Sequence, residues 1–128
     1  MTSEELIACI AERYSTEPEY PWGDENFIFR HLNNRKWFAT GMRPPARVLG
    51  IAGEEAVEIV NVKCDPRLAG AYRALPGVLP AYHMNKEHWL TLVLQSAGDS
   101  IQSAGDETIK ELLELSFDLT AGKGRRRR

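Results

Sequence analysis

The sequence has little cysteine, no long apolar run and no basic segment at its start. Two cysteines among 128 residues, Cys9 and Cys64, are too few for a disulfide framework, which is typical of proteins kept in a reducing compartment. No apolar stretch approaches the length that crosses a bilayer, and the opening MTSEELIACIAERY is acidic where a signal peptide would be basic. We therefore expect a cytoplasmic protein with no membrane partner.

A net positive charge is also missing. The 16 Lys and Arg residues are outnumbered by 18 Asp and Glu, and the C-terminal KGRRRR supplies five of the 16. Most of the other basic residues lie between residues 30 and 88, with acidic segments on either side. This balance excludes a chain that is basic throughout, so any phosphate-binding surface must be local.

Composition predicts one folded domain over residues 1–121, followed by a basic flexible tail at 122–128. The chain is 43% hydrophobic and 9% aromatic, which is enough for a single core. Thr2 and Glu5 have the spacing of a capping box, and the apolar residues that follow recur at helical spacing up to Tyr14. An amphipathic helix is therefore expected at the N-terminus.

Five β-prone runs follow this helix. NFIFRH and RKWFATGM flank Asn33 and Asn34, which tolerate the positive φ of a tight hairpin turn. ARVLGI and AVEIVNV flank the turn signal AGEE, so these four runs predict an antiparallel meander, and HWLTLVL predicts a fifth strand. The aromatic strand residues expected mostly in the core are Phe27, Phe29, Trp37, Phe38 and Trp89.

Two further helices are predicted from their end signals. Asp65 and Pro66 are a typical N-cap and first helical residue, and Asp106 is the expected cap of the last helix. The expected apolar face of the first is Leu68, Ala71, Tyr72 and Leu75, and that of the second is Ile109, Leu112, Leu113, Ser116 and Phe117. The order of elements predicts an α+β fold: a mainly antiparallel sheet of about five strands with helices packed on one face.

The segment QSAGD occurs twice, at residues 95–99 and 102–106. Two copies are too few to indicate a repeat fold. The second copy supplies the expected helix cap, and the first is expected to lengthen a polar loop.

Two stretches are more specific than these patterns. VNVKCDP runs into a predicted helix and GVLPAYHMNKEHW into a predicted strand; together with YPWGDENFIFRHLNNRKWFA and ELLELSFDLT, they resemble the MmcQ/YjbR family of small bacterial proteins. The resemblance implies a CyaY-like fold, described as a double-wing DNA-binding type, in a stand-alone protein. It implies no defined enzymatic activity. The duplicated QSAGD loop and the GKGRRRR terminus depart from the family pattern.

Catalytic and metal-binding patterns are scarce. The sequence contains no Gly-x-Ser-x-Gly, phosphate-loop or His-Glu-x-x-His motif, and Cys64 beside Lys63 is the best candidate nucleophile. Strand-end cysteines are more often packed, so a buried thiol is expected. The three histidines, His31, His83 and His88, are too dispersed to predict converging ligands. We therefore expect no enzymatic activity, no metal and no cofactor.

The string YHMNKEHW at residues 82–89 leaves three interpretations open. In a structural one, Tyr82 and His83 hydrogen-bond across the sheet and Asn85 shapes a turn. In a second, hairpin and loop residues hold the backbone of double-stranded DNA: Arg30, Arg35, Lys36, Arg43, Lys63, Lys86 and His88. In a third, a cleft binds a small anionic ligand or a protein partner through Tyr82, His83, Lys86 and Trp89.

Overall fold

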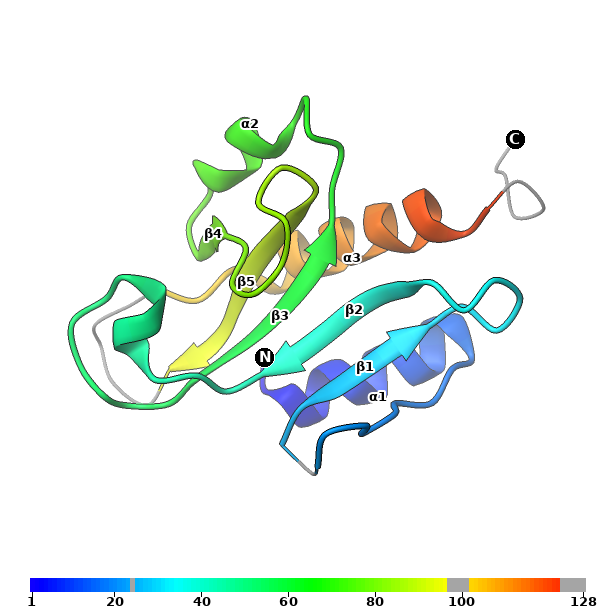
Figure 1. Ribbon diagram of the computed structural model, residues 1–128, viewed down its shortest axis with the longest axis horizontal. Helices are drawn as coiled ribbons and strands as arrows, with labels where there is room; N and C mark the ends of the chain where they lie inside the picture. Colours follow the sequence, from blue (N-terminus) through cyan, green and yellow to red (C-terminus); the bar gives the residue numbers. More distant parts are fainter. Residues whose placement is uncertain (24, 97–101, 123–128) are drawn as a thin grey trace.

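The computed structural model describes residues 1–23, 25–96 and 102–122, which form a five-stranded sheet with helices (Figure 1). The strands lie in the order β1-β2-β3-β5-β4, and neighbouring strands are antiparallel. The predicted α+β class and the predicted antiparallel sheet are therefore confirmed. In chain order the elements are α1 (Ser3–Tyr14), β1 (Phe27–Arg30), β2 (Trp37–Met42), η1 (Ala46–Leu49), β3 (Val57–Lys63), α2 (Ala69–Arg73), β4 (Val78–Pro80), β5 (Trp89–Ser96) and α3 (Asp106–Thr120).

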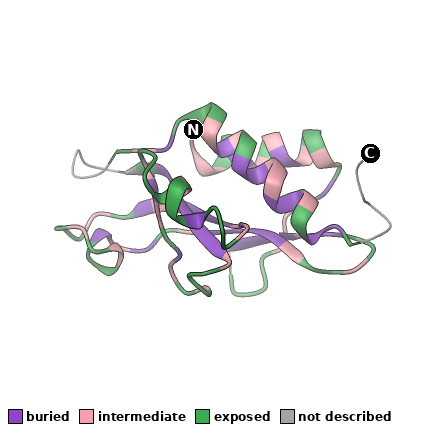
Figure 2. Ribbon diagram, turned by 90° about the horizontal axis from the view of Figure 1, so that it is seen from above, coloured by how far each residue is buried: buried purple, intermediate pink, exposed green. Residues whose placement is uncertain are grey.

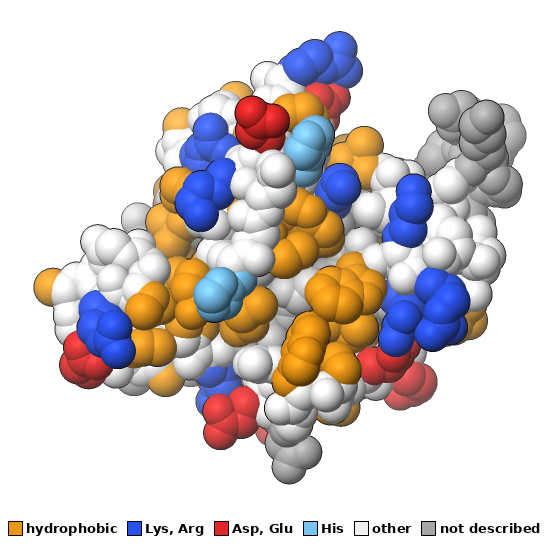
Figure 3. Space-filling model, viewed as in Figure 1, with side chains coloured by type: hydrophobic (Ala, Val, Ile, Leu, Met, Phe, Trp, Pro, Cys, Tyr) orange, Lys and Arg blue, Asp and Glu red, His pale blue; other side chains and the backbone are white. Residues whose placement is uncertain are grey.

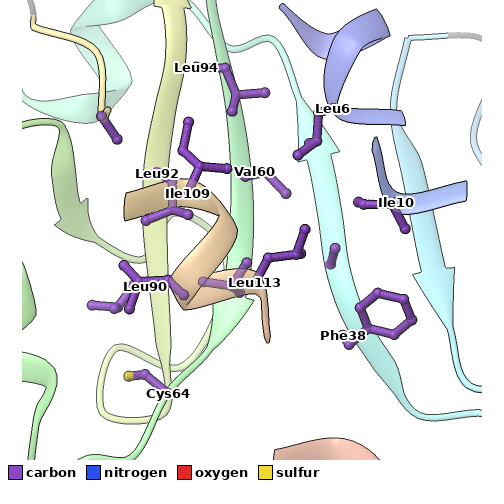
Figure 4. Close-up of a cluster of buried hydrophobic side chains, with 14 of the residues drawn as sticks. Leu6, Ile10, Phe38, Val60, Cys64, Leu90, Leu92, Leu94, Ile109 and Leu113 are labelled. Atoms are coloured by element: carbon purple, nitrogen blue, oxygen red, sulfur yellow. The ribbon is translucent and has the colours of Figure 1, made fainter. Parts of the chain in front are cut away.

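Helices α1 and α3 pack on one face of the sheet, as predicted (Figures 1 and 2). Leu6 of α1 and Leu113 of α3 are fully buried in the main core, which lies between these helices and the strands (Figure 4). The rings of Tyr14 and Phe117 stack between the two helices, with centroids 4.3 Å apart. The opposite face of the sheet is covered in part by a second buried cluster, in which Ala46 of η1 packs with Val57, Ile59 and Val93, and the surface beyond that cluster is available for a functional site.

The first helix begins where the capping box predicts. Thr2 Oγ1 accepts a hydrogen bond from the Glu5 amide at 3.1 Å, and the Glu5 carboxylate accepts one from the Thr2 amide at 2.8 Å. These bonds satisfy amide hydrogens that a helix start leaves without partners. The Ser3 amide donates to Glu58 of β3 at 2.8 Å, which ties the start of the helix to the sheet.

The prediction of a strand at ARVLGI is wrong, because its first four residues form the 3-10 helix η1, Ala46–Leu49. Pro44 and Pro45 precede it, and a proline, which has no amide hydrogen, suits the start of a helix better than the ladder of a sheet. Gly50 ends η1 with a φ of 80°. The meander consequently has three strands instead of four, and the remaining edge position is taken by β4, a three-residue strand that the pattern did not indicate.

The helix predicted after Cys64 starts later than expected. Asp65 is not its N-cap: the Asp65 carboxylate accepts hydrogen bonds from the amide and the guanidinium of Arg67, within a turn that precedes the helix. Helix α2 begins at Ala69, whereas Leu68 and Leu75 of the predicted apolar face are 46% and 40% exposed. The aspartate signal therefore marks a turn, and of the predicted apolar face only Tyr72 packs, half-buried, against the main core.

The predicted buried face of helix α3 is confirmed, and its N-cap lies one residue before the predicted one. Its N-cap is Gly105, and Asp106 is the first helical residue. The buried residues include all five predicted ones: Ile109, Leu112, Leu113, Ser116 and Phe117.

Two predicted segments fall mostly outside the described residues. These are the loop at the first QSAGD copy, residues 95–99, and the basic tail, residues 122–128. Within the described ranges, no helix combines the length and the apolar character needed to span a bilayer.

Candidate functional site

The face of the sheet opposite α1 and α3 carries several of the predicted basic residues. Figure 3 shows hydrophobic side chains across the middle of this face, with Lys and Arg and several Asp and Glu around them. Phe38 and Val62 belong to the core under the helices, so their neighbours Trp37 and Lys63 point to the other face. Trp89 of β5 is paired directly opposite Lys63. We call this surface the open face.

A shallow groove of about 380 Å³ lies at one end of the open face. Lys63 Nζ lies 5.4 Å from the ring centroid of Trp89, a cation–π contact that holds the ammonium over the indole. Three of the described lining residues are cationic and none is acidic, so the groove is suited to an anion. The residues that line it are Arg35, Lys36, Trp37, Lys63, Trp89, Leu119 and Thr120.

The hairpin turn that carries Arg35 and Lys36 is bound to the C-terminal end of α3. The Asn34 side chain donates to the Thr120 carbonyl at 2.9 Å and accepts from the Lys36 amide at 2.9 Å. The sequence predicted that the asparagines would adopt the positive φ of this turn. In the structure Arg35 adopts it instead, with a φ of 65°. Asn34 instead satisfies a carbonyl that the helix end leaves without a partner, which fixes the position of the two cations.

His31 supports the same junction from inside the fold. Its side chain is buried, and its Nε2 lies 3.0 Å from the Phe117 carbonyl oxygen and 2.8 Å from Thr120 Oγ1. The imidazole also packs against Phe38 and Phe117 at centroid distances of 5.1 Å and 4.4 Å. His31 is therefore a structural residue. In the part of the chain that the structure describes, no three His, Cys, Asp or Glu side chains are grouped to hold a metal ion.

Ser116 of α3 is fully buried and joins β2 to β3 beside the groove residue Lys63. The pairing of β2 with β3 ends at Ala39 and Val62. Just beyond that pair, the Ser116 hydroxyl donates to the Phe38 carbonyl at 2.6 Å and accepts from the Lys63 amide at 2.8 Å. One hydroxyl thus satisfies two backbone groups where the strands separate.

Two residues predicted to face phosphates are engaged by carboxylates instead. Arg30 Nε donates to Glu19 Oε2 at 2.9 Å, and this bond lowers the pKa of Glu19 and raises that of Arg30. Arg43 donates to Glu58 at 3.0 Å. A phosphate would have to displace a carboxylate from either arginine, so we expect the groove cations to contribute more to anion binding.

Lys86 and His88 lie outside this groove. Lys86 lines a second groove of about 580 Å³ together with Arg73 and Glu87, and Arg73 donates to the Lys86 carbonyl at 3.4 Å. His88 is half-buried, and its carbonyl accepts a hydrogen bond from the Cys64 amide at 2.8 Å. The seven predicted phosphate contacts therefore do not form one surface: Arg35, Lys36 and Lys63 come together, and the others do not.

A buried polar network ties the start of YHMNKEHW to the sheet. Asn61, which is fully buried, donates to the Tyr82 carbonyl at 3.0 Å and accepts from the Thr91 hydroxyl, which itself accepts from the Tyr82 amide at 2.8 Å. Asn85 then shapes the predicted turn, because its side-chain oxygen accepts from the Glu87 amide at 2.8 Å. The structural interpretation is supported for Tyr82, through its backbone, and for Asn85, whereas His83 is exposed and its ring packs on Tyr82.

The four residues of the predicted ligand cleft lie apart. Trp89 lines the first groove and Lys86 the second. The rings of Tyr82 and His83 pack against each other at a centroid distance of 4.1 Å, and His83 is exposed with a φ of 64°. No single described groove therefore contains all four side chains.

Cys64 is the buried thiol that the sequence predicts, with 4% of the residue exposed. Burial raises its pKa, which disfavours the nucleophilic thiolate. Cys9 on α1 is half-buried.

We expect iodoacetamide to alkylate Cys9 in the folded protein at least about tenfold faster than Cys64. Peptide mass spectrometry at timed intervals measures both rates, with the urea-unfolded chain as control; equal rates in the folded protein would contradict the expectation.

Sequence reasoning missed three residues of these surfaces. Trp37 is half-buried on the open face rather than in the core, and Trp22, 58% exposed, meets it edge to face with ring centroids 5.7 Å apart. Arg73 lines the groove of Lys86. The alternation of side chains along β2 could have assigned Trp37 to the open face only if the irregular register of this hairpin had been known. Trp22 and Arg73 reach their positions through loop and helix packing, for which the sequence carries no local signal.

Comparison with known proteins gives a consistent result. A family model described as YjbR matches residues 11–119. The protein YyaQ of Bacillus subtilis (strain 168), described as uncharacterized, is 35% identical over 122 residues, which cover 94% of this chain and 98% of that one. A crystal structure from Pseudomonas syringae is similar with a TM-score of 0.84 at 39% identity, covering 94% and 99% of the two chains. The crystal structure of Deinococcus radiodurans protein DR2400, with a domain called DUF419, is similar with a TM-score of 0.65 at 25% sequence identity. The match covers 96% of this chain and 80% of that one.

Proposed function

This chain belongs to the YjbR family, and from that membership and the geometry of the groove we propose that it is a DNA-binding protein without catalytic activity. In this proposal, Arg35, Lys36 and Lys63 hold the phosphate backbone of double-stranded DNA. Contacts of this kind position a protein on DNA without reading its sequence, so modest specificity is expected.

The single observation that carries the proposal is the groove with three cations and no acidic lining residue. Arg35 and Lys36 are exposed at a hairpin turn, where they can reach a duplex from outside. The hairpin backbone is bound to α3 through Asn34, so the residues that carry the two cations are positioned before DNA binds. Preorganised charges lose less entropy on binding.

The competing function, a cleft for a small anionic ligand or a protein partner, has weaker support because its side chains divide between two grooves. Catalysis by a thiol also has weak support, since Cys64 is buried and burial raises its pKa.

The test is fluorescence anisotropy of a labelled duplex of about two helical turns. The full chain carries serine at positions 125–128, because four consecutive arginines bind DNA weakly whatever the domain does. We expect Lys36→Ala and Lys63→Ala each to weaken binding about three- to tenfold, and to reduce the slope of log affinity against log salt by about 0.9 for each lost phosphate contact.

Arg47→Ala is the matched control. Arg47 lies in η1, at the opposite end of the sheet from the hairpin, where it pairs with Glu54 at 3.0 Å (Figure 1). The Arg47→Ala variant removes one positive charge, as Lys63→Ala does, but lies outside the groove. It should therefore weaken binding to the duplex much less than Lys63→Ala does. The proposal is wrong if the two variants weaken binding equally, or if the duplex does not bind in a salt-dependent manner.

A further inference from the structure

A row in which cations and aromatic rings alternate crosses the open face. Arg30 of β1 is paired opposite Trp37 of β2, and Lys63 of β3 is paired opposite Trp89 of β5. Building on the proposed function, we infer that the DNA held here carries an unpaired stretch, whose bases stack on Trp37 and Trp22 while the groove cations hold its phosphates.

The Trp22–Trp37 pair offers ring surface to a ligand. Trp22 is 58% exposed and Trp37 is half-buried. Their ring planes meet at 77° with centroids 5.7 Å apart, so the two indoles form a corner and not a closed stack. Trp89 differs, because it is 9% exposed and lies under the Lys63 ammonium. Trp89 therefore orients Lys63, and the exposed corner is where a base would stack.

The charges beside this corner suit phosphates. In the part of the chain that the structure describes, no ion pair engages Arg35, Lys36 or Lys63. Glu19 is the acidic residue near Arg35, but its carboxylate is already held by Arg30. Positive charge thus remains available on one side of the aromatic corner.

An unpaired strand fits this combination better than a fully paired duplex. In a duplex the base faces are covered by neighbouring base pairs, so exposed indoles on a sheet contribute little to binding. Unpaired bases offer a free face to aromatic side chains, and proteins that bind single strands combine such rings with a cationic path for the backbone. The phosphate contacts alone explain the cations, whereas base stacking also explains why Trp22 is exposed beside Trp37.

The test compares a labelled 24-nucleotide single strand with the blunt duplex of the same sequence, at matched salt, with the full chain carrying serine at positions 125–128. We expect the single strand to bind about tenfold more tightly, which is the effect of one stacked base. Trp22→Ala should remove about that factor for the single strand and leave the duplex affinity and the salt slope unchanged. Because Trp22 is mostly exposed, this variant is expected to fold; Trp37→Leu is the second variant.

Tyr20→Ala is the aromatic control, since Tyr20 is 45% exposed but lines a different pocket, beside α1. It should leave both affinities unchanged. An equal or tighter affinity for the duplex would overturn the inference, as would a Trp22→Ala loss that is the same for both probes. In those cases a loss on Lys63→Ala would still support phosphate binding. If Lys63→Ala also has no effect on either probe, the proposed function itself fails. A third arm with RNA of the same sequence shows which sugar the site accepts.

Discussion

Replacing Gly77 with alanine is expected to destabilise the fold by about 2–5 kcal/mol, through a left-handed backbone and a steric clash together. Gly77 has a φ of 77°, which L side chains rarely adopt. A Cβ at this position would lie 2.1 Å from the Ala104 nitrogen and 2.5 Å from the Ser103 carbonyl carbon. Both contacts are with backbone atoms, so no side-chain rotation can relieve them.

The clash would also disturb β5, because the two approaching segments bind the same residue. The Val93 amide donates to the Gly77 carbonyl at 2.8 Å, and the Val93 carbonyl accepts from the Ala104 amide at 2.8 Å. Moving either segment away lengthens one of these bonds. The effect is measured by urea unfolding of the wild type and of Gly77→Ala, followed by circular dichroism.

Gly70→Ala is the control for this prediction. Gly70 lies inside α2, and a Cβ built there has no atom within 4 Å. Alanine should be neutral or stabilise the protein by up to about 1 kcal/mol, as in an exposed helix interior. Equal unfolding midpoints for the two variants would contradict the account of Gly77.

The second large effect is expected at Asn61. Asn61→Ala should cost about 2–4 kcal/mol of unfolding free energy, because it leaves a part-buried carbonyl and a buried hydroxyl without their partner. These groups belong to Tyr82 and Thr91. The long contact to Thr40, 3.5 Å, is expected to contribute little.

A double-mutant cycle tests this network. Thr91→Val should also destabilise, since it removes the acceptor of the Tyr82 amide. If Asn61 and Thr91 act as one network, Asn61→Ala in the Thr91→Val background should cost less than it does alone, with a coupling of about 0.5–3 kcal/mol. Strict additivity within error would mean that the two side chains stabilise the loop independently.

How far the sequence predicted the fold depends on how local each signal is. The capping box of Thr2 and Glu5 is complete within four residues, and the helix starts as predicted. The periodic apolar face of α3 is likewise confirmed. At residues 46–51 the apolar run indicated a strand, but Pro44 and Pro45 decide the outcome by their missing amide hydrogens. The three residues of β4 are too few to show any periodicity.

The candidate site was predicted less completely, because its residues converge from several elements. Lys36 and Lys63 were selected from charge, but their meeting in one groove depends on the packing of β2 and β3 against α3. The irregular register between Phe29 and Arg30 decides which face of the hairpin carries Trp37. Such a bulge has no sequence signature, so the position of the aromatic residues of the site could not be predicted from the sequence.

Ser116 connects the groove cation Lys63 to the packing of α3 on the sheet. The amide hydrogen of Lys63 is held by a side chain of α3 and not by a neighbouring strand. This hydrogen must leave the Ser116 hydroxyl before it exchanges with solvent, so its exchange rate would report on the docking of α3 from within the surface that carries the cations.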